Sequence, residues 1–228
     1  MNKIIESLNL LASMDTELLQ IIGVTLKMSF FSTLISCLIG IPLGVLLSKS
    51  RFKGKKTINR IINTLMGLPP VVAGLLVYLL FTHYGPFGRL GILFTVKAMV
   101  IAQCLLITPV VISLSNSIVS VRVNRLTENA KGMGLPKHKI FALLVTENRT
   151  ALLSVVLTAF GRSIAEVGAV SLVGGNIQWK TRVMTTAILL ETNKGNFSFA
   201  LALGIVLLII ALIVNIIASL LVREETND

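Results

Sequence analysis

The chain has 228 residues, of which 54% are hydrophobic and 14% are charged, and its mean hydropathy is +0.86. Soluble domains carry about 25% charged residues, so this composition excludes a water-soluble globule and also a disordered chain. The net charge is +11. The basic residues lie in gaps between apolar runs, where they report membrane orientation, so we expect membrane lipid and no nucleic acid as a partner. Four to six spans of about 20 residues would use the whole length.

The chain begins with residues 1–20, in which apolar and acidic residues are mixed. They lack the basic start and small-residue cleavage site of a secretory signal, and we expect a short helix lying at the membrane surface. The first long apolar run is Met28–Leu47. Gly40 and Gly44 stand four apart in it, a pattern that lets helices approach closely, and Pro42 can bend this span.

Six basic residues and no acid follow the first span: Lys49, Arg51, Lys53, Lys55, Lys56 and Arg60. The run Ile61–Thr82 is uncharged and predicts a second span, with two prolines inside it. His83–Gly91 is a short turn. A third uncharged run, Ala98–Val119, predicts another span, whose helix starts as early as Ile92.

A second basic connection covers residues 122–149, with six basic residues against Glu128 and Glu147. A fourth span is expected from about Thr150 to Val173 and a fifth over Phe197–Val222, with Met184–Leu190 dipping partway into the membrane. Positive charge favours the cytoplasmic side. The pattern therefore predicts an all-α membrane protein: five spans over residues 21–222, an external N-terminus and a cytoplasmic tail at residues 223–228.

No catalytic motif is apparent. The stretch Gly54-Lys-Lys-Thr57 lacks the earlier glycine that a nucleotide-binding loop requires. No Ser/His/Asp or Cys/His set is evident, and two histidines and two cysteines are too few to indicate a metal site. An enzyme is therefore disfavoured, and we expect neither catalytic nor metal-binding residues.

The second basic connection holds the most informative stretch, Glu128–Phe141. Its glycines predict a helix end at Gly132–Gly134, followed by a new short helix with Pro136 in its first turn. Leu135, Ile140 and Phe141 can form one apolar face, which would suit a groove on another protein. An ordinary helix–turn–helix connection explains the same pattern, and the residues alone do not decide between the two.

At this stretch the chain resembles a known family. Glu128, Ala130 and Gly134 are similar to the Glu-Ala-Ala-xxx-Gly core of the cytoplasmic loop in permease subunits of binding-protein-dependent ABC importers, with Asn129 in place of the second motif residue. In that family the loop forms a coupling helix that docks onto the ATPase. The resemblance implies the same role here, and the expected coupling residues are Glu128, Ala130, Gly134, Leu135, Pro136, Ile140 and Phe141.

A second stretch, Phe160–Ile177, resembles tungstate and molybdate permeases, and Thr181–Ile188 with Leu190–Gly195 is similar to the tungstate branch. The family implies a type I ABC importer fold in a prokaryotic cytoplasmic membrane. It also implies a homodimer of permeases, two ATPase subunits that carry ATP and Mg, and an external oxyanion-binding protein. No cofactor is then expected on this chain itself.

Charged and small residues share the same stretch. Gly161, Ala165 and Ala169 recur every four residues and would make one smooth helix face. Arg162 and Glu166 also stand four apart, so they can pair along one side. Charges at membrane depth are costly and face a bundle interior or a water-filled path, so the two are either a structural ion pair or part of a gate.

Positive potential and hydrogen-bond donors favour the passage of an oxyanion. The expected residues of the path or gate are Arg162, Ser163, Glu166, Gly174, Gly175 and Asn176. Tungstate and molybdate share charge and tetrahedral shape, so the sequence favours tungstate but leaves molybdate or another oxyanion open. Two alternatives from other classes are a self-sufficient secondary transporter or channel, which often shows repeated halves, and a membrane scaffold with a docking loop.

Overall fold

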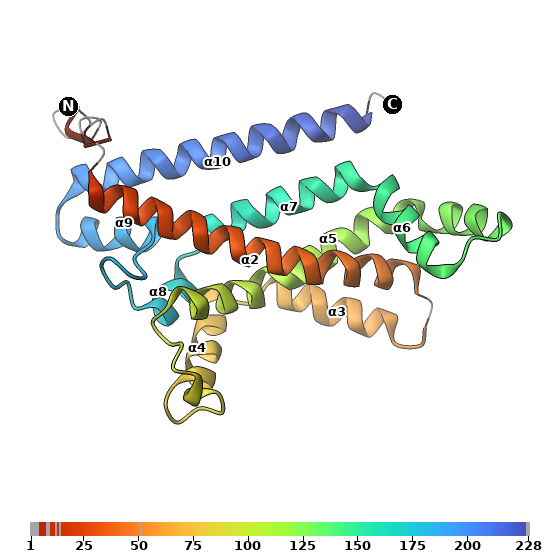
Figure 1. The fold of residues 1–228 in the computed structure, drawn as a ribbon, viewed down its shortest axis with the longest axis horizontal. Coiled ribbons are helices and arrows are strands. Elements are labelled where there is room, and N and C mark those ends of the chain that lie inside the picture. Colours follow the sequence, from red (N-terminus) through yellow and green to blue (C-terminus); the bar gives the residue numbers. More distant parts are fainter. Residues whose placement is uncertain (1–4, 8–9, 12, 14, 51, 227–228) are drawn as a thin grey trace.

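The computed structural model describes residues 5–7, 10–11, 13, 15–50 and 52–226, and it describes side chains as far as Leu220. Within these residues the chain is helical and contains no strand, as predicted. The longest helices are α2 (Thr16–Lys49), α5 (Val96–Gly132) and α10 (Phe197–Thr226), which run along the long axis of the molecule (Figure 1). We call the end that carries α6 the inner end, and the end where α2 begins the outer end.

Three helices are long and apolar enough to cross a membrane, namely Thr16–Lys49, Val96–Gly132 and Phe197–Leu220. Two further pairs pass the same test together but are sharply bent, Lys55–Met66 with Pro70–Phe81 and Lys137–Glu147 with Arg149–Ile164. The count reaches five only if each bent pair is one span, so the five spans stay a prediction.

Helix α2 starts earlier than the apolar run suggests. Asp15 caps it by accepting hydrogen bonds from the backbone N–H groups of Glu17 and Leu18, at 2.9 and 3.1 Å. Residues 16–20, expected in a separate surface helix, are therefore the first turns of α2. Of that expected helix, residues 1–4, 8–9, 12 and 14 lie outside the described residues.

Helices α2 and α5 form the centre of the fold, and small residues let them approach closely. A Cβ added at Gly40 would lie 2.7 Å from Val111 Cγ1, and one added at Gly44 would lie 2.7 Å from the carbonyl oxygen of Ile112. Any larger side chain at either position would push the helices apart. The predicted close packing through Gly40 and Gly44 is confirmed.

The second predicted span is broken. Helix α3 (Lys55–Met66) and helix α4 (Pro70–Phe81) meet at an angle of 97°. The break follows from Pro69 and Pro70, because proline lacks the N–H that a continuing helix needs and disfavours helical backbone in the residue before it. The predicted span over Ile61–Thr82 is therefore formed by two helices with a sharp bend between them, and α3 begins within the first basic connection. A short 3₁₀ turn, η1 (Gly88–Leu90), follows α4.

Helix α5 continues into the predicted loop and ends only at Gly132. Val119, Val123 and Ala130 are buried along this extension, and their helical spacing explains why a polar segment stays helical. The second basic connection is thus mostly helix, comprising the end of α5 and all of α6 (Lys137–Glu147).

The fourth predicted span is also broken, at Ala165–Val167, between α7 (Arg149–Ile164) and α8 (Gly168–Gly174). Helix α9 (Met184–Asn193) covers the segment expected to dip into the membrane, and that depth stays a prediction. Helix α10 then returns along α7 towards the inner end (Figure 1), and the side chains of its last turns, from residue 221 on, lie outside the described residues.

Candidate functional site

A tight reversal joins α5 to α6 at the inner end. The N–H groups of Met133, Gly134 and Leu135 donate to the carbonyls of Asn129, Lys131 and Ala130, at 3.1, 2.9 and 3.0 Å. Gly134 has φ +72°, a left-handed conformation that glycine adopts without strain at the end of a helix. Pro136 precedes the first residue of α6. The predicted helix end and the new short helix are both confirmed.

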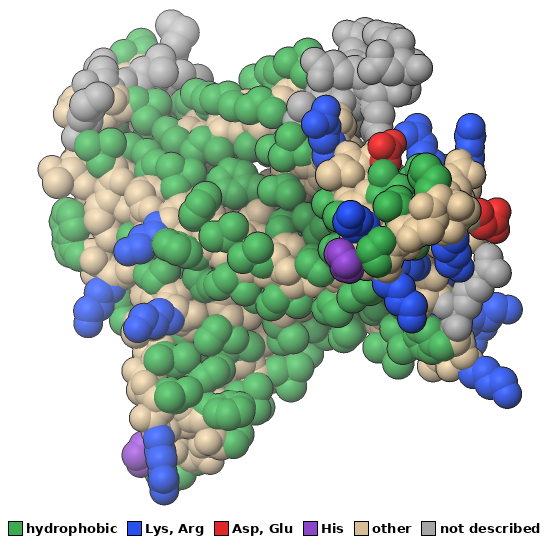
Figure 2. Space-filling model, turned by 45° about the vertical axis from the view of Figure 1, so that its right-hand side comes forward, with side chains coloured by type: hydrophobic (Ala, Val, Ile, Leu, Met, Phe, Trp, Pro, Cys, Tyr) green, Lys and Arg blue, Asp and Glu red, His purple; other side chains and the backbone are tan. Residues whose placement is uncertain are grey.

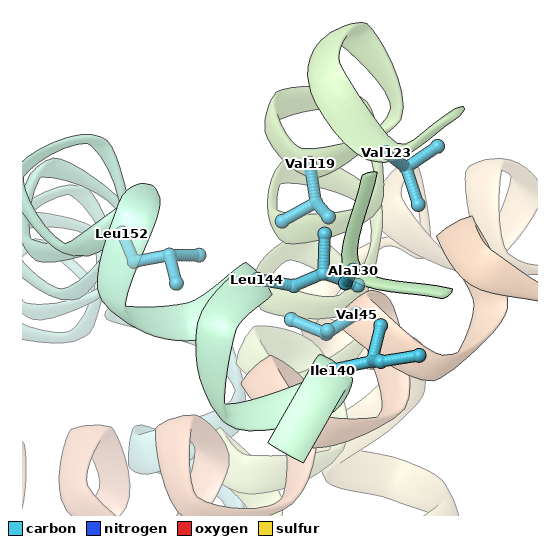
Figure 3. Packing of buried hydrophobic residues seen from close by; sticks show 7 residues of the cluster. All are labelled: Val45, Val119, Val123, Ala130, Ile140, Leu144 and Leu152. Carbon is cyan, nitrogen blue, oxygen red and sulfur yellow. The ribbon is translucent and has the colours of Figure 1, made fainter. Parts of the chain in front are cut away.

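The apolar face of α6 points into the protein. Ile140 is 2% exposed and Leu144 is fully buried, and both belong to one cluster with Val45, Val119, Val123, Ala130 and Leu152 (Figure 3). Leu135 and Phe141 pack against the same cluster. The residues do form one apolar face, as predicted, and α2 and the extension of α5 cover it, as the alternative of an ordinary helix–turn–helix connection implies.

The surface that remains open at the reversal is polar and basic. Glu128, Gly134, Pro136 and His138 are exposed, and Met133 is 68% exposed. Lys137 and Lys139 flank His138, and Figure 2 shows basic side chains gathered at this end of the molecule. A partner that docks here therefore meets the reversal and the outward face of α6.

Arg162 and Glu166 do not form the ion pair that their spacing allows. Arg162 lies in the last turn of α7 and donates from Nη2 to the carbonyl of Met66, at 3.5 Å. Glu166 lies in the break, where its Oε1 accepts from the N–H of Ala169 at 3.1 Å. Among the described residues, ion pairs join only Arg182 with Glu17 and Lys194 with Glu191. The i, i+4 argument fails because α7 ends at Ile164.

Both side chains nevertheless line one small hollow. It is too narrow to hold a water molecule and is also lined by Gln103, Leu106 and Ile107 of α5. Arg162 is exposed, and Glu166 is partly exposed. The structure therefore brings the two predicted gate residues to the same place without joining them, beside the breaks between α3 and α4 and between α7 and α8.

The small residues of this region do not share one face. Gly161 lies near α10, with Val214 Cγ1 4.0 Å from an added Cβ. Ala169 lies on the far side of the break and packs against Gly74 of α4, while Ala165 is exposed. The predicted smooth face is wrong for the same reason as the ion pair, since a continuous helix is absent there.

Ser163 belongs to a buried polar network. Its hydroxyl lies 2.8 Å from Ser32 Oγ and donates to Gln103 Oε1 at 2.8 Å, and Gln103 Nε2 donates to the Ser163 carbonyl at 2.8 Å. Ser32 also donates to Gln103 Oε1, at 2.6 Å. All three residues are fully buried, so the network joins α2, α5 and α7. Sequence reasoning missed Ser32 and Gln103, although both are polar residues inside apolar runs.

Gly174, Gly175 and Asn176 form a turn at the end of α8. Gly175 and Asn176 have φ of +70° and +49°. The Gly174 carbonyl accepts from Thr181 Oγ1 at 2.6 Å, and Asn176 Oδ1 accepts from Thr186 Oγ1 at 2.9 Å. The contacts described for this turn fix the segment that leads to α9, and none of them reaches Arg162 or Glu166.

A charged cluster at the outer end was not foreseen. Arg182 pairs with Glu17 at 2.7 Å, while Glu191 accepts from Lys194 and from Asn196, both at 2.9 Å. The cluster lines a pocket of about 170 Å³. Burial raises the pKa of the Glu191 carboxyl, but the two hydrogen bonds and the charges of Lys194 and Arg182 outweigh it, so this pKa is lowered.

Comparison with known proteins identifies the family. Residues 40–226 match the family described as binding-protein-dependent transport system inner membrane component. The chain belongs to this family. It is 36% identical to the tungstate uptake system permease protein TupB of Peptoclostridium acidaminophilum, over 96% of each chain. It is 40% identical to the protein of the same name in Campylobacter jejuni, over 96% of this chain and 91% of the relative. A probable anion ABC transporter permease of Haloferax volcanii is 38% identical over 90% of each.

Family membership settles the class of protein. The chain is a multi-pass inner-membrane subunit of a binding-protein-dependent transport system, with the permease fold of type I ABC importers. It is a transport subunit. The self-sufficient transporter and the scaffold, which the sequence left open, are both excluded by this membership.

Proposed function

We propose that this chain is the membrane subunit of a tungstate importer. The observation that carries the proposal is the identity of 36–40%, over 96% of this chain, to two permeases named for tungstate uptake. A separate ATPase subunit hydrolyses ATP and carries the Mg ion, while this chain provides the route and binds no cofactor. Molybdate is the main competing substrate, because it has the same charge and the same tetrahedral shape.

The proposed assembly contains two copies of this chain, two ATPase subunits and an external oxyanion-binding protein. Its orientation places the inner end in the cytoplasm. In support, Lys49 Nζ donates to the Lys137 carbonyl at 3.3 Å, so the two basic connections lie together at one end, where positive charge favours the cytoplasm. The N-terminus then lies outside and the C-terminus inside.

In this proposal the reversal between α5 and α6 couples the permease to the ATPase. Glu128, Gly134 and Pro136 offer the exposed contact surface. Ala130, Leu135, Ile140 and Phe141 act differently, since they fasten this surface to α2 and α5 through the buried cluster. A push on the reversal is thereby transmitted to both central helices, because a packed apolar cluster moves as a unit.

Arg162 and Glu166 border the anion route in the same proposal. Their support is their shared hollow beside two helix breaks, since irregular backbone and charge at membrane depth are tolerated where they line a cavity or a bundle interior. Ser163, Gly174, Gly175 and Asn176 shape the route indirectly. They hold α7, α8 and the following turn in place through the hydrogen bonds described above.

Reconstitution tests the function. The chain is co-expressed with its ATPase, purified as a complex and placed in vesicles that enclose ATP, and binding protein loaded with tungstate is added outside. We expect binding-protein-dependent tungsten accumulation that molybdate-loaded protein supports less well. Failure to co-purify with an ATPase contradicts the importer assembly, whereas transport of molybdate but not of tungstate contradicts the substrate alone.

A further inference from the structure

Helix α3 carries a basic face that continues from the first basic connection towards the helix break. Lys56, Arg60 and Asn63 follow one another at i, i+4 and i+7, so they lie along one side of the helix, and all three are exposed. The exposed apolar residues Ile58 and Ile61 lie on another face, at 41% and 54% exposure. Helix α3 therefore has an apolar face that suits contact with lipid and a polar face that suits a hydrated environment.

The polar face of α3 continues onto α5. Ser113 Oγ donates to Asn63 Oδ1 at 3.0 Å, and Ser117 is exposed one turn further along α5. The two helices run in opposite directions, as Figure 1 shows. In agreement, Lys55 Nζ donates to the Ser48 carbonyl, at the inner end of α2, at 2.9 Å. Each step from Asn63 towards Lys56 therefore moves towards the inner end.

Arg162 stands at the other end of this face. Its guanidinium reaches the carbonyl of Met66, the last residue of α3. Met66 and Lys56 are ten residues apart, which is about 15 Å along a helix, or about half the apolar thickness of a bilayer. Arg162, Arg60 and Lys56 thus place three positive charges between the helix breaks and the inner end. None of the three has an acidic partner within 4.0 Å among the described residues.

We infer that Lys56, Arg60, Asn63, Ser113, Ser117 and Arg162, which we call the inner strip, form the cytoplasmic half of the anion route. The inference rests on the proposed function and extends it. Charged side chains at membrane depth face water or a bundle interior and not lipid, and guanidinium, ammonium and hydroxyl groups all donate to a tetrahedral dianion. Well-spaced single donors suit conduction, because each holds the anion weakly enough to release it.

Uptake by charge variants tests the inner strip in the reconstituted complex. We expect Arg60→Gln and Lys56→Gln to lower the rate of tungstate uptake by about fivefold to tenfold each, the effect of losing one hydrogen bond of ordinary strength. Arg60→Lys should keep most of the rate. The matched control is Lys53→Gln, an exposed lysine just before α3, which removes the same charge from the same end. Equal uptake by Arg60→Gln and Lys53→Gln overturns the inference.

The vesicle composition separates an anion route from a lipid contact. Each variant is measured with and without phosphatidylglycerol, an anionic lipid. A deficit of Arg60→Gln that is the same in both supports the route. A deficit that appears only with phosphatidylglycerol assigns Arg60 to lipid headgroups and overturns the inference. Wild-type protein that takes up no tungstate contradicts the proposed substrate instead, so the two failures differ.

Thiol labelling gives a second readout that does not depend on transport. Ser117→Cys and Ile61→Cys are made after Cys37 and Cys104 are replaced by alanine. We expect an anionic methanethiosulfonate reagent to modify Ser117→Cys, and excess tungstate to slow this reaction. Ile61→Cys, on the apolar face of α3, should react slowly with or without tungstate. Labelling of Ser117→Cys that tungstate does not slow, or no labelling of it, overturns the inference.

Discussion

Gly74 of α4 lies directly against Ala169 of α8, so close that a Cβ on Gly74 would stand 2.7 Å from the Ala169 Cα. Each helix follows a break in a predicted span, and Arg162 crosses between the two breaks to the Met66 carbonyl. The two broken spans are therefore joined to each other on both sides of their bends. The contact between Gly74 and Ala169 therefore holds the two non-helical breaks next to each other, beside the residues assigned to the anion route.

Enlarging Gly74 should separate the two broken spans. We expect Gly74→Val to reduce the yield of folded protein and to lower its melting temperature in detergent, because the neighbouring atoms are backbone and cannot move aside. Gly204→Val is the matched control, since nothing lies within 4 Å of a Cβ added there. Equal melting temperatures for the two variants would show that α4 does not pack on α8 in this way.

The buried network of Ser32, Gln103 and Ser163 should contribute to stability. Gln103→Leu keeps the approximate volume but removes the shared acceptor of both serine hydroxyls and the donor to the Ser163 carbonyl, and the loss of a buried hydrogen-bond partner costs about 1–3 kcal/mol. Chemical denaturation of the detergent-solubilised protein measures this loss. Thr158→Val serves as the control because Thr158 is exposed and donates only to a carbonyl of its own helix, that of Ser154. A stable Gln103→Leu variant would contradict the assigned network.

Two variants at the inner end should distinguish residues that hold α6 in the protein from residues that bind the ATPase. Leu144→Ala removes a fully buried side chain and should cost about 2–5 kcal/mol of stability. Met133→Ala changes an exposed side chain, so we expect it to weaken binding to the ATPase with little change in stability. Melting temperature and co-purification with the ATPase are measured for both. Normal ATPase binding by Met133→Ala would contradict the assignment of the docking surface to the reversal.

The outer cluster predicts a specific response to acid. Hydrogen bonds and nearby positive charge hold the pKa of Glu191 below its ordinary value of 4.5, so the charged form is favoured in the folded state. This contribution to stability is present above that ordinary value and is lost as the pH falls through the lowered pKa. Between neutral pH and pH of about 3, wild type should lose more stability than Glu191→Gln. Equal losses of stability by wild type and Glu191→Gln would contradict the assigned contacts of Glu191 with Lys194 and Asn196.

How far the sequence predicts the structure depends on the kind of pattern. The close approach through Gly40 and Gly44 and the helix end at Gly134 follow from short-range geometry, and both were predicted. The two prolines at the break were noted inside the predicted second span, but no break was predicted there, because hydropathy does not distinguish a straight span from a broken one. Proline chemistry alone gives no angle.

Two features of the candidate site depend on structure that the sequence pattern does not show. The pairing of Arg162 with Glu166 assumed a continuous helix, and no proline marks the end of α7 at Ile164. For the face with Ile140 the sequence left docking and an ordinary connection open, and Val45, from a distant part of the chain, covers it. Burial of this kind depends on long-range contacts, which a periodic pattern along the chain does not contain.

The last prediction concerns Arg162 and Glu166, which share a hollow without forming a pair. Arg162→Gln and Glu166→Gln each keep a polar group that can replace the single hydrogen bond observed, to the Met66 carbonyl or from the Ala169 N–H. Residues that do not interact have additive effects, within about 0.5 kcal/mol. We therefore expect the double variant to show the summed change in unfolding free energy of the two single variants.

Uptake should distinguish the two residues more strongly than stability does. Loss of the Arg162 cation removes positive potential from the start of the inner strip, so Arg162→Gln should slow tungstate uptake while the complex still assembles. Glu166→Gln removes negative charge beside the same route and should leave uptake unchanged or faster, because a dianion is repelled by a carboxylate. Both rates are normalised to assembled complex. A coupling energy well above about 0.5 kcal/mol between the two substitutions would show that Arg162 and Glu166 do interact. Equal uptake by both variants would contradict the assignment of Arg162 to the anion route.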